Sequence, residues 1–312
     1  MKRALWLALL ASFASTPASA YVRARTDAGV PLRWPGDCVY MQPDSGGTPD
    51  LDDTTLFATL QSTVQHNWDD PLAGMSYISL RYDMPAKLEA ALDGINMIKF
   101  RTDVWCHGGD PKDTCYSSVA TAITSVLFVE DGHSGAGTIL DTDVEMNDVN
   151  FIFTNLPTMP PSVPAGRSVA DLQNTLTHEL GHVLGLDHTC SVAGVTPASE
   201  VDDTGAFPPA CDALASLPAA EQTKIETATM YPTYSTGEIS KRTPHPDDLA
   251  GVEIDYPTAS DPKSCEHANV GAFQKSSCAL APNGQSSAAI VLMMFALLGL
   301  LRRRARVHNS RQ

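Results

Sequence analysis

The chain has 312 residues, of which 43% are hydrophobic and 18% charged, a balance that excludes collagen, coiled coils and wholesale disorder. Its formal charge is −15, from 21 basic and 36 acidic residues. Seven of the bases lie at the two ends of the chain, which leaves 14 bases against 36 acids and a formal charge of −22 in the central part. Such a surface repels phosphate groups, so we expect no binding to nucleic acid or to an anionic membrane surface.

Residues 1–20 have the three-part layout of a secretory signal peptide. Lys2 and Arg3 form a basic start, an apolar run extends to about Ala14, and small residues end the segment. We predict cleavage after Ala20. A buried first helix is the alternative, but the apolar run is short and begins beside positive charge.

The elements of the body follow from periodicity, in chain order. A hairpin or two short strands are expected at 21–26 and 30–34, and a helix at Thr54–Trp68, where apolar residues recur every fourth position. A short helix is expected at Lys87–Leu92, and the proline-rich segment 157–164 is expected to be a loop. Further strands are predicted at Cys38–Gln42, Tyr77–Tyr82, Ile95–Arg101, Ile123–Val129, Thr138–Met146 and Asn150–Thr154.

A second main helix is predicted at Ser168–Leu184. Ser168 with Asp171 three positions later resembles a capping box, and Gly185 is a residue that can take positive φ and end a helix. Helices and a mixed sheet in one compact region predict an α+β domain over residues 21–265.

The chain has seven cysteines, an odd number for an exported protein. Cys278 lies in the C-terminal tail and is the natural unpaired one. The simplest of the 15 pairings of the other six is Cys38 with Cys265, Cys106 with Cys115, and Cys190 with Cys211. A cysteine-based zinc site is the competing interpretation, but no pair has the spacing such sites use.

The segment from Thr177 to His188 reads THELGHVLGLDH and carries the chemistry. His178 and His182 are four residues apart, so both imidazoles project from one helix face, as a single tetrahedral metal requires. Glu179 lies about 100° around the helix, where it can act on a water without binding the metal. Gly185 permits a sharp turn that returns His188 as a third ligand. Three nitrogen ligands with an open fourth position predict one catalytic Zn²⁺.

At these residues the sequence resembles the metzincin zinc peptidases, and in particular the matrixins. The segment 228–232, ATMYP, is similar to their Met-turn, which implies that Met230 lies beneath the zinc. Residues 247–252 with Tyr256 look like the matrixin C-terminal helix, and 139–143 is similar to a strand of bacterial relatives. The resemblance implies a metzincin-like zincin domain, with a mixed twisted sheet, an active-site helix and a C-terminal helix. No cysteine-switch segment is found, because the sequence around Cys38 does not match one.

Asp141, Asp143 and Glu145 alternate along one predicted strand and are candidate Ca²⁺ ligands. The competing interpretation is an ordinary strand whose acids face solvent.

The C-terminal end is apolar from Ala288 to Leu301 and then carries an arginine cluster at 302–306. As a helix this run spans only ~21 Å, short of a ~30 Å hydrocarbon core unless flanking residues contribute. With Cys278 it resembles the surface-sorting tail of myxobacterial proteins, which implies a linker with a processed cysteine at 266–287 and a membrane anchor with a cytoplasmic arginine-rich tail at 288–312. A plain single-span anchor is the alternative. Export and sorting machinery are the expected partners, and the membrane is contacted only through this helix.

The expected function is that of an exported or surface-anchored zinc endopeptidase, in which Glu179 is the general base toward a metal-activated water. A polypeptide substrate would lie antiparallel to an exposed edge strand, which we expect to be Thr138–Met146, whose acids would favour basic or neutral peptides. The alternatives are a surface-anchored binding protein with structural zinc and no peptidase activity, and a hydrolase of small amides or esters.

Overall fold

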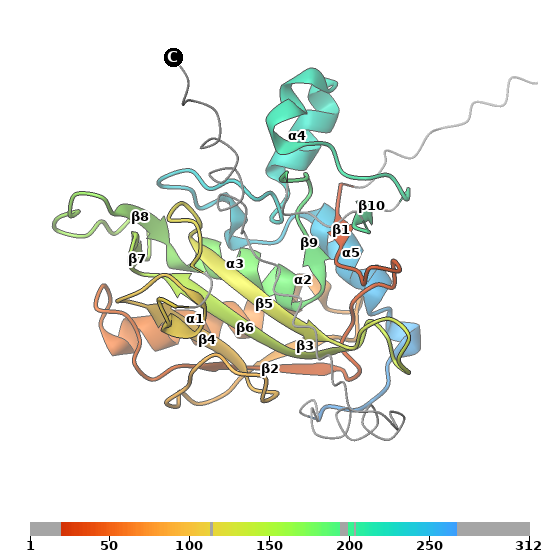
Figure 1. The fold of residues 1–312 in the computed structure, drawn as a ribbon, viewed down its shortest axis with the longest axis horizontal. Helices are drawn as coiled ribbons and strands as arrows, with labels where there is room; N and C mark the ends of the chain where they lie inside the picture. The colour runs from red at the N-terminus through yellow and green to blue at the C-terminus, as the bar shows by residue number, and fades with distance from the viewer. Residues whose placement is uncertain (1–19, 113–114, 194–198, 203, 267–312) are drawn as a thin grey trace, which may run out of the picture.

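A mixed five-stranded sheet forms the framework of the domain (Figure 1). The computed structural model describes residues 20–112, 115–193, 199–202 and 204–266. The strand order is β3-β2-β4-β6-β5, and only β5 runs antiparallel to its neighbour. The bounds are Cys38–Pro43 for β2, Ser79–Tyr82 for β3, Asn96–Arg101 for β4, Ala122–Phe128 for β5 and Ile139–Asn147 for β6. The α+β class predicted from the sequence is confirmed.

Smaller elements complete the described fold. Two-stranded and three-stranded sheets are formed by β7 (Phe151–Thr154) with β8 (Ser168–Asp171), and by β10 (Val201–Asp202), β1 (Val22–Arg23) and β9 (Leu186–Asp187). The α-helices are α1 (Asp53–His66), α2 (Asp69–Leu72), α3 (Leu172–Val183), α4 (Ala219–Thr227) and α5 (Pro246–Asp255). Four 3₁₀ turns are η1 (His107–Gly109), η2 (Cys211–Ser216), η3 (Ser240–Arg242) and η4 (Thr258–Ser260).

Helices α1 and α3 pack against each other and share one hydrophobic core with the sheet. The apolar residues of α1 that recur at helical spacing, Leu56, Leu60 and Val64, are buried in that core. Just after α1, the indole Nε1 of Trp68 donates to the carbonyl of Thr177 at 3.0 Å, inside α3. This bond fixes the position of α3 along α1.

The structure corrects two helix predictions. Lys87–Leu92 is not helical, because its backbone N–H groups have other acceptors: Leu88 donates to Asp44, and Ala91 donates to Asp143. Helix α3 begins at Leu172 and not at Ser168, because residues 168–171 pair with β7 as strand β8. The cap is therefore Asp171, whose carboxylate accepts from the N–H of Asn174 at 2.8 Å.

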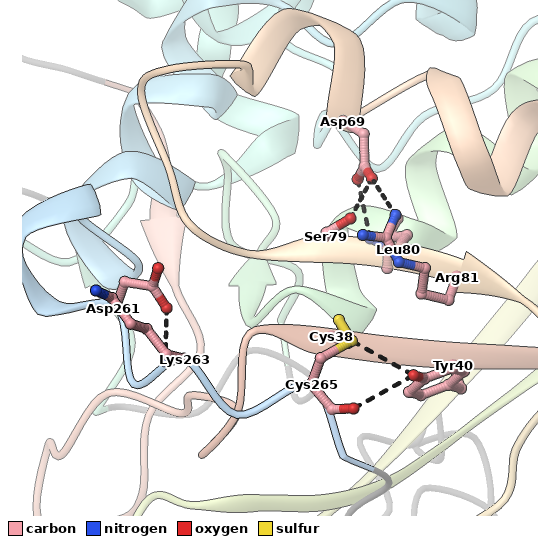
Figure 2. The surroundings of a disulfide bond; sticks show 9 residues. All are labelled: Cys38, Tyr40, Asp69, Ser79, Leu80, Arg81, Asp261, Lys263 and Cys265. Carbon is pink, nitrogen blue, oxygen red and sulfur yellow. Dashed lines mark hydrogen bonds and ion pairs between the residues drawn. A yellow bond between two sulfur atoms is a disulfide. The ribbon is translucent and has the colours of Figure 1, made fainter.

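The three disulfides of the simplest pairing are present: Cys38–Cys265, Cys106–Cys115 and Cys190–Cys211. Figure 2 shows the first of them, which joins the start of β2 to the segment after η4. The Tyr40 hydroxyl lies 3.4 Å from both the carbonyl oxygen and the sulfur of Cys265. Disulfides persist in oxidising compartments, so they indicate an exported protein.

Several predictions fall on residues outside the described ones. Residues 1–19 of the predicted signal peptide and residues 267–312, which include Cys278 and the predicted anchor, are not described. Within the described ranges, no helix has both the length and the apolar character needed to cross a membrane. The predicted domain boundaries remain predictions.

The Cys38–Cys265 bridge closes a loop of 227 residues, whereas Cys106–Cys115 closes one of 9. Loop-closure entropy then predicts a loss of about 5 kcal/mol of unfolding free energy for Cys38→Ser with Cys265→Ser, against about 2.5 kcal/mol for the matched Cys106→Ser, Cys115→Ser pair. Urea unfolding of the two double variants measures this difference. Equal losses would contradict the dependence of this stabilisation on loop length.

Candidate metal centre

Helix α3 and the turn after it carry the candidate metal ligands. His178 and His182 lie on α3, which ends where Gly185 takes a φ of +93°. A side chain there would place Cβ 2.6 Å from the carbonyl oxygen of Leu32, so both the backbone angle and the space require glycine. The chain then turns back through β9, and His188 follows directly.

The three imidazoles converge on one point. Nε2 of His188 lies 3.3 Å from Nε2 of His178 and 3.2 Å from Nε2 of His182. Two nitrogens bound to one zinc at ~2.0–2.1 Å in tetrahedral geometry are about 3.3 Å apart. The described residues therefore form a three-histidine group whose spacing fits a single zinc ion.

Backbone carbonyls orient two of the rings. Nδ1 of His178 lies 2.6 Å from the carbonyl oxygen of Thr229, and Nδ1 of His182 lies 2.9 Å from that of Leu186. Since a carbonyl only accepts, each Nδ1 carries the proton and each Nε2 keeps its lone pair for a metal. Burial lowers the pKa of both His178 and His188 well below the usual value, which keeps them in the neutral form that binds metal.

Glu179 lies beside the three histidines, 4% exposed. Its Oε2 accepts a hydrogen bond of 2.7 Å from the hydroxyl of Thr124 on β5. Burial raises the pKa of Glu179, while this hydrogen bond acts in the opposite direction. The carboxylate is therefore held at a fixed place with a higher proton affinity than a surface glutamate has.

Met230 lies beneath the histidine-bearing helix and packs directly against the helix backbone at Gly181. Gly181 faces it: a Cβ at Gly181 would lie 2.2 Å from the sulfur of Met230 and 3.1 Å from the Trp68 ring. The turn that carries Met230 is also tied to α5, because the carboxylate of Asp248 accepts from the N–H of Thr229 at 2.6 Å. The C-terminal helix and the ligand helix are thus held together by this turn.

A cavity of about 330 Å³ opens beside the centre. Its walls come from the segment before β5, from α3, from the chain after Met230 and from η3. The lining residues are Ser117, Val119, Ala120, Thr121, Asn174, Thr175, His178, Glu179, His188, Pro232, Thr233, Tyr234 and Lys241.

The edge strand next to this cavity is β5 and not the predicted Thr138–Met146. That segment forms β6, which lies between β4 and β5 in the sheet (Figure 1). The edge prediction was wrong because alternation along one strand carries no information about its neighbours.

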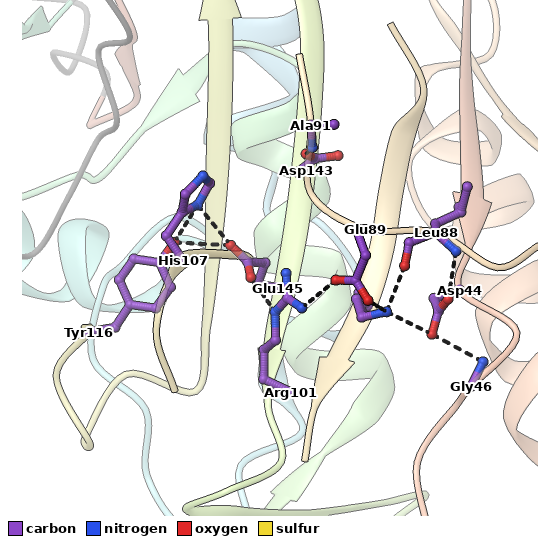
Figure 3. Close-up of polar contacts among 11 residues, drawn as sticks. Asp44, Gly46, Leu88, Glu89, Ala91, Arg101, His107, Tyr116, Asp143 and Glu145 are labelled. Atoms are coloured by element: carbon purple, nitrogen blue, oxygen red, sulfur yellow. Dashed lines mark hydrogen bonds and ion pairs between the residues drawn. The ribbon is translucent and has the colours of Figure 1, made fainter. Parts of the chain in front are cut away.

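The acids of β6 do not face solvent, which corrects one of the two interpretations of them. Asp141 is 2% exposed, Asp143 6% and Glu145 0%. Figure 3 shows Glu145 in a buried polar cluster, where it accepts from Arg101 and from the Tyr116 hydroxyl, the latter at 3.0 Å.

The two aspartates accept backbone N–H groups from residues 91–97 instead. Within the described ranges these three carboxylates do not form a convergent ligand group. They act as acceptors for the protein, and Ca²⁺ binding remains a prediction.

Comparison with known proteins gives little. No protein-family model matches the chain, and no curated protein matches it. Among solved structures the chain is similar to one titled "Structure of Myroilysin", at 13% sequence identity over 75% of this chain and 84% of that chain, with a TM-score of 0.32. A likeness at this TM-score carries no argument about activity.

The three histidines, Glu179 and Met230 are predictable from the sequence, and the structure brings these residues together. Three further residues of the site, Thr124, Gly181 and Lys241, were not predicted. A glycine inside an amphipathic helix often indicates that another side chain packs closely against the helix backbone, so Gly181 could have been predicted. No local pattern marks Thr124 or Lys241, because both reach the centre from elements distant in the sequence.

We expect about one zinc per chain, and loss of one ligand in His182→Ala should weaken zinc binding by at least about a hundredfold. Elemental analysis with chelator competition measures both quantities. Thr124→Val is the matched control, because it alters a contact to Glu179 and leaves every imidazole nitrogen in place. Full zinc retention in His182→Ala would contradict the assignment of this ligand.

Burial, with the nearby charge of Asp141, raises the pKa of Asp143 to about 8. The folded state therefore binds this proton more tightly than the unfolded chain, and the contribution of Asp143 to stability falls as pH rises from about 4 to about 8. Asp143→Asn should flatten that fall by up to about 1.4 kcal/mol per pH unit, although loss of one acceptor lowers stability at every pH. Urea unfolding at pH 4, 6 and 8 tests this. An unchanged slope would refute the raised pKa.

Proposed function

We propose that this protein is an exported zinc-dependent endopeptidase of the metzincin type, with matrixin-like features. The observation that carries the proposal is the placement of one buried carboxylate, Glu179, beside three converging imidazole nitrogens at the wall of an open cavity. A purely structural zinc site has no use for such a carboxylate.

A zinc ion held by the three histidines would lower the pKa of a bound water. It would also place a positive charge beside the carbonyl oxygen of the peptide bond to be cleaved. Glu179 would accept the proton from the attacking water and deliver it to the leaving amine. Thr124 holds the carboxylate in position through the 2.7 Å hydrogen bond. The carbonyls of Thr229 and Leu186 keep the histidines in the ligating tautomer.

The substrate in this proposal is an extended polypeptide that pairs with the outer edge of β5, where no other described strand is paired. Edge strands present unpaired backbone groups that bind a peptide without regard to its sequence. Thr124 lies on this strand and contacts Glu179, so a peptide along β5 would pass the catalytic carboxylate. This arrangement favours a peptide over a small amide or ester.

Cellular location forms part of the proposal. The signal peptide would direct export, and the tail with Cys278 would retain the protein at the surface at least transiently, through the sorting machinery. The three disulfides support an oxidising destination.

Glu179→Ala should lower cleavage of casein or gelatin by about 10²- to 10⁴-fold while zinc content stays at one per chain, because the carboxylate moves the proton and does not bind the metal. Zinc analysis and protease assays on wild type and variant in parallel measure this. Thr124→Val keeps the carboxylate and removes its hydroxyl donor, so its cleavage activity should lie between those of wild type and Glu179→Ala.

Equal activity in wild type and Glu179→Ala would refute the mechanism. Zinc in both with cleavage of no unfolded protein by either would favour the surface-anchored binding protein.

A further inference from the structure

The cavity beside the metal centre contains a buried lysine. Lys241 lies on η3, is 6% exposed, and lines the same cavity as His178 and Glu179. Its backbone N–H donates to the side-chain oxygen of Asn174 on α3 at 2.8 Å, which fixes η3 against the ligand helix. The backbone of Lys241 is therefore held against α3, at the wall of the cavity.

The ammonium group of Lys241 has neutral partners. Nζ donates to the carbonyl oxygens of Tyr231 at 2.6 Å and Thr233 at 2.8 Å, which uses two of its three donors. Neither acceptor carries a charge, and within the described part of the chain the carboxylates that favour the ammonium act at longer range. A buried cation without a contacting anion is costly, and an anion entering the cavity offsets that cost.

Burial lowers the pKa of Lys241, and a carboxylate placed near it would raise that pKa again.

A second polar group in the same cavity wall, a buried hydroxyl, has no hydrogen-bond partner among the described residues. Thr175 lines the cavity, is 4% exposed, and its hydroxyl makes no hydrogen bond to any described residue. The cavity thus combines a cation with a donor that has no partner, which is the chemistry that binds a carboxylate.

The direction of a bound peptide follows from β5. Thr124 on β5 marks the position of Glu179, and the cavity wall at residues 117–121 precedes it in the chain. A peptide antiparallel to β5 runs toward those earlier residues with its C-terminal half. The cavity would therefore receive the side chain that follows the cleaved bond.

We propose that this cavity selects an acidic side chain, aspartate or glutamate, at the residue immediately after the cleaved bond, and that Lys241 is the specificity-determining residue. This inference rests on the proposed function for the register of the peptide. It replaces the expectation that acids near the site favour basic or neutral substrates, since the acids of β6 are buried and bonded to protein donors.

The test uses the zinc-loaded full chain with Glu179→Gln, which binds peptide without cleaving it. Two fluorescent peptides are compared by anisotropy, identical except for Asp or Asn at the position after the bond that wild type cleaves, or at each central position in turn if no cleavage is found. We expect the Asp peptide to bind at least about tenfold more tightly than the Asn peptide. Adding Lys241→Met should reduce the difference to within about twofold.

Lys87→Met is the charge-matched control, because Lys87 is exposed and lies outside the cavity. It should keep the full preference for Asp. Lys241→Arg, which retains the charge, should keep part of the preference for the Asp peptide. If Lys241 had only a structural role, Lys241→Met would weaken the binding of both peptides equally. If Lys241→Met fails to fold, as judged by thermal unfolding and zinc content, the Asp preference of the Glu179→Gln protein decides alone.

Equal binding of the two peptides, binding of neither at millimolar concentration, or full retention of the preference in folded Lys241→Met would each overturn the inference. Asp preference without cleavage by wild type would uphold the acidic site and refute the peptidase. Cleavage by wild type with no preference for an acidic residue after the cleaved bond would uphold the peptidase and refute the acidic site.

Discussion

The close contact between helix α3 and the turn at Met230 is the constraint on which the rest of the site depends. Gly181 has no side chain, so the Met230 sulfur and the Trp68 ring both reach the helix backbone. That approach brings the carbonyl of Thr229 to the ring of His178. Asp248 holds the same turn from α5. The absence of a side chain at Gly181 thus determines where two helices, one turn and one ligand meet, because the close packing of protein interiors has no room for a bulkier residue.

Burial gives the site its electrostatic character. Near the three histidines, Asp187 and Asp248 each keep a buried carboxylate oxygen that has no hydrogen-bond partner among the described residues. Burial raises the pKa of Asp187 and brings that of Asp248 to about 7. Uncompensated acids around neutral imidazoles leave a region that favours positive charge. Lys241 is the one buried cation described in the cavity wall, and the charge of Asp248 is among those that favour its ammonium form.

Local patterns predicted most of the fold, and the failures share one cause. The five sheet strands and helix α1 were found because alternation and fourfold spacing record which face of an element is buried. The prediction of a short helix at Lys87–Leu92 was wrong because the carboxylates of Asp44, just after β2, and Asp143, on β6, accept from its backbone N–H groups. The start of α3 was misplaced because residues 168–171 had a strand partner in β7. The ligands were predictable because all three lie within eleven residues, whereas Thr124 and Lys241 join the site only through tertiary contacts.

The Cys38–Cys265 bridge has a consequence for how damage to this protein would be seen. It joins positions near the two ends of the described domain, so a single backbone cut anywhere between them leaves both fragments covalently attached. A protease that occasionally cut its own loops would migrate as an intact chain on a gel run without reductant. Self-digestion would become visible only after thiol treatment, and apparent resistance to nicking would measure the bridge rather than the rigidity of the loops.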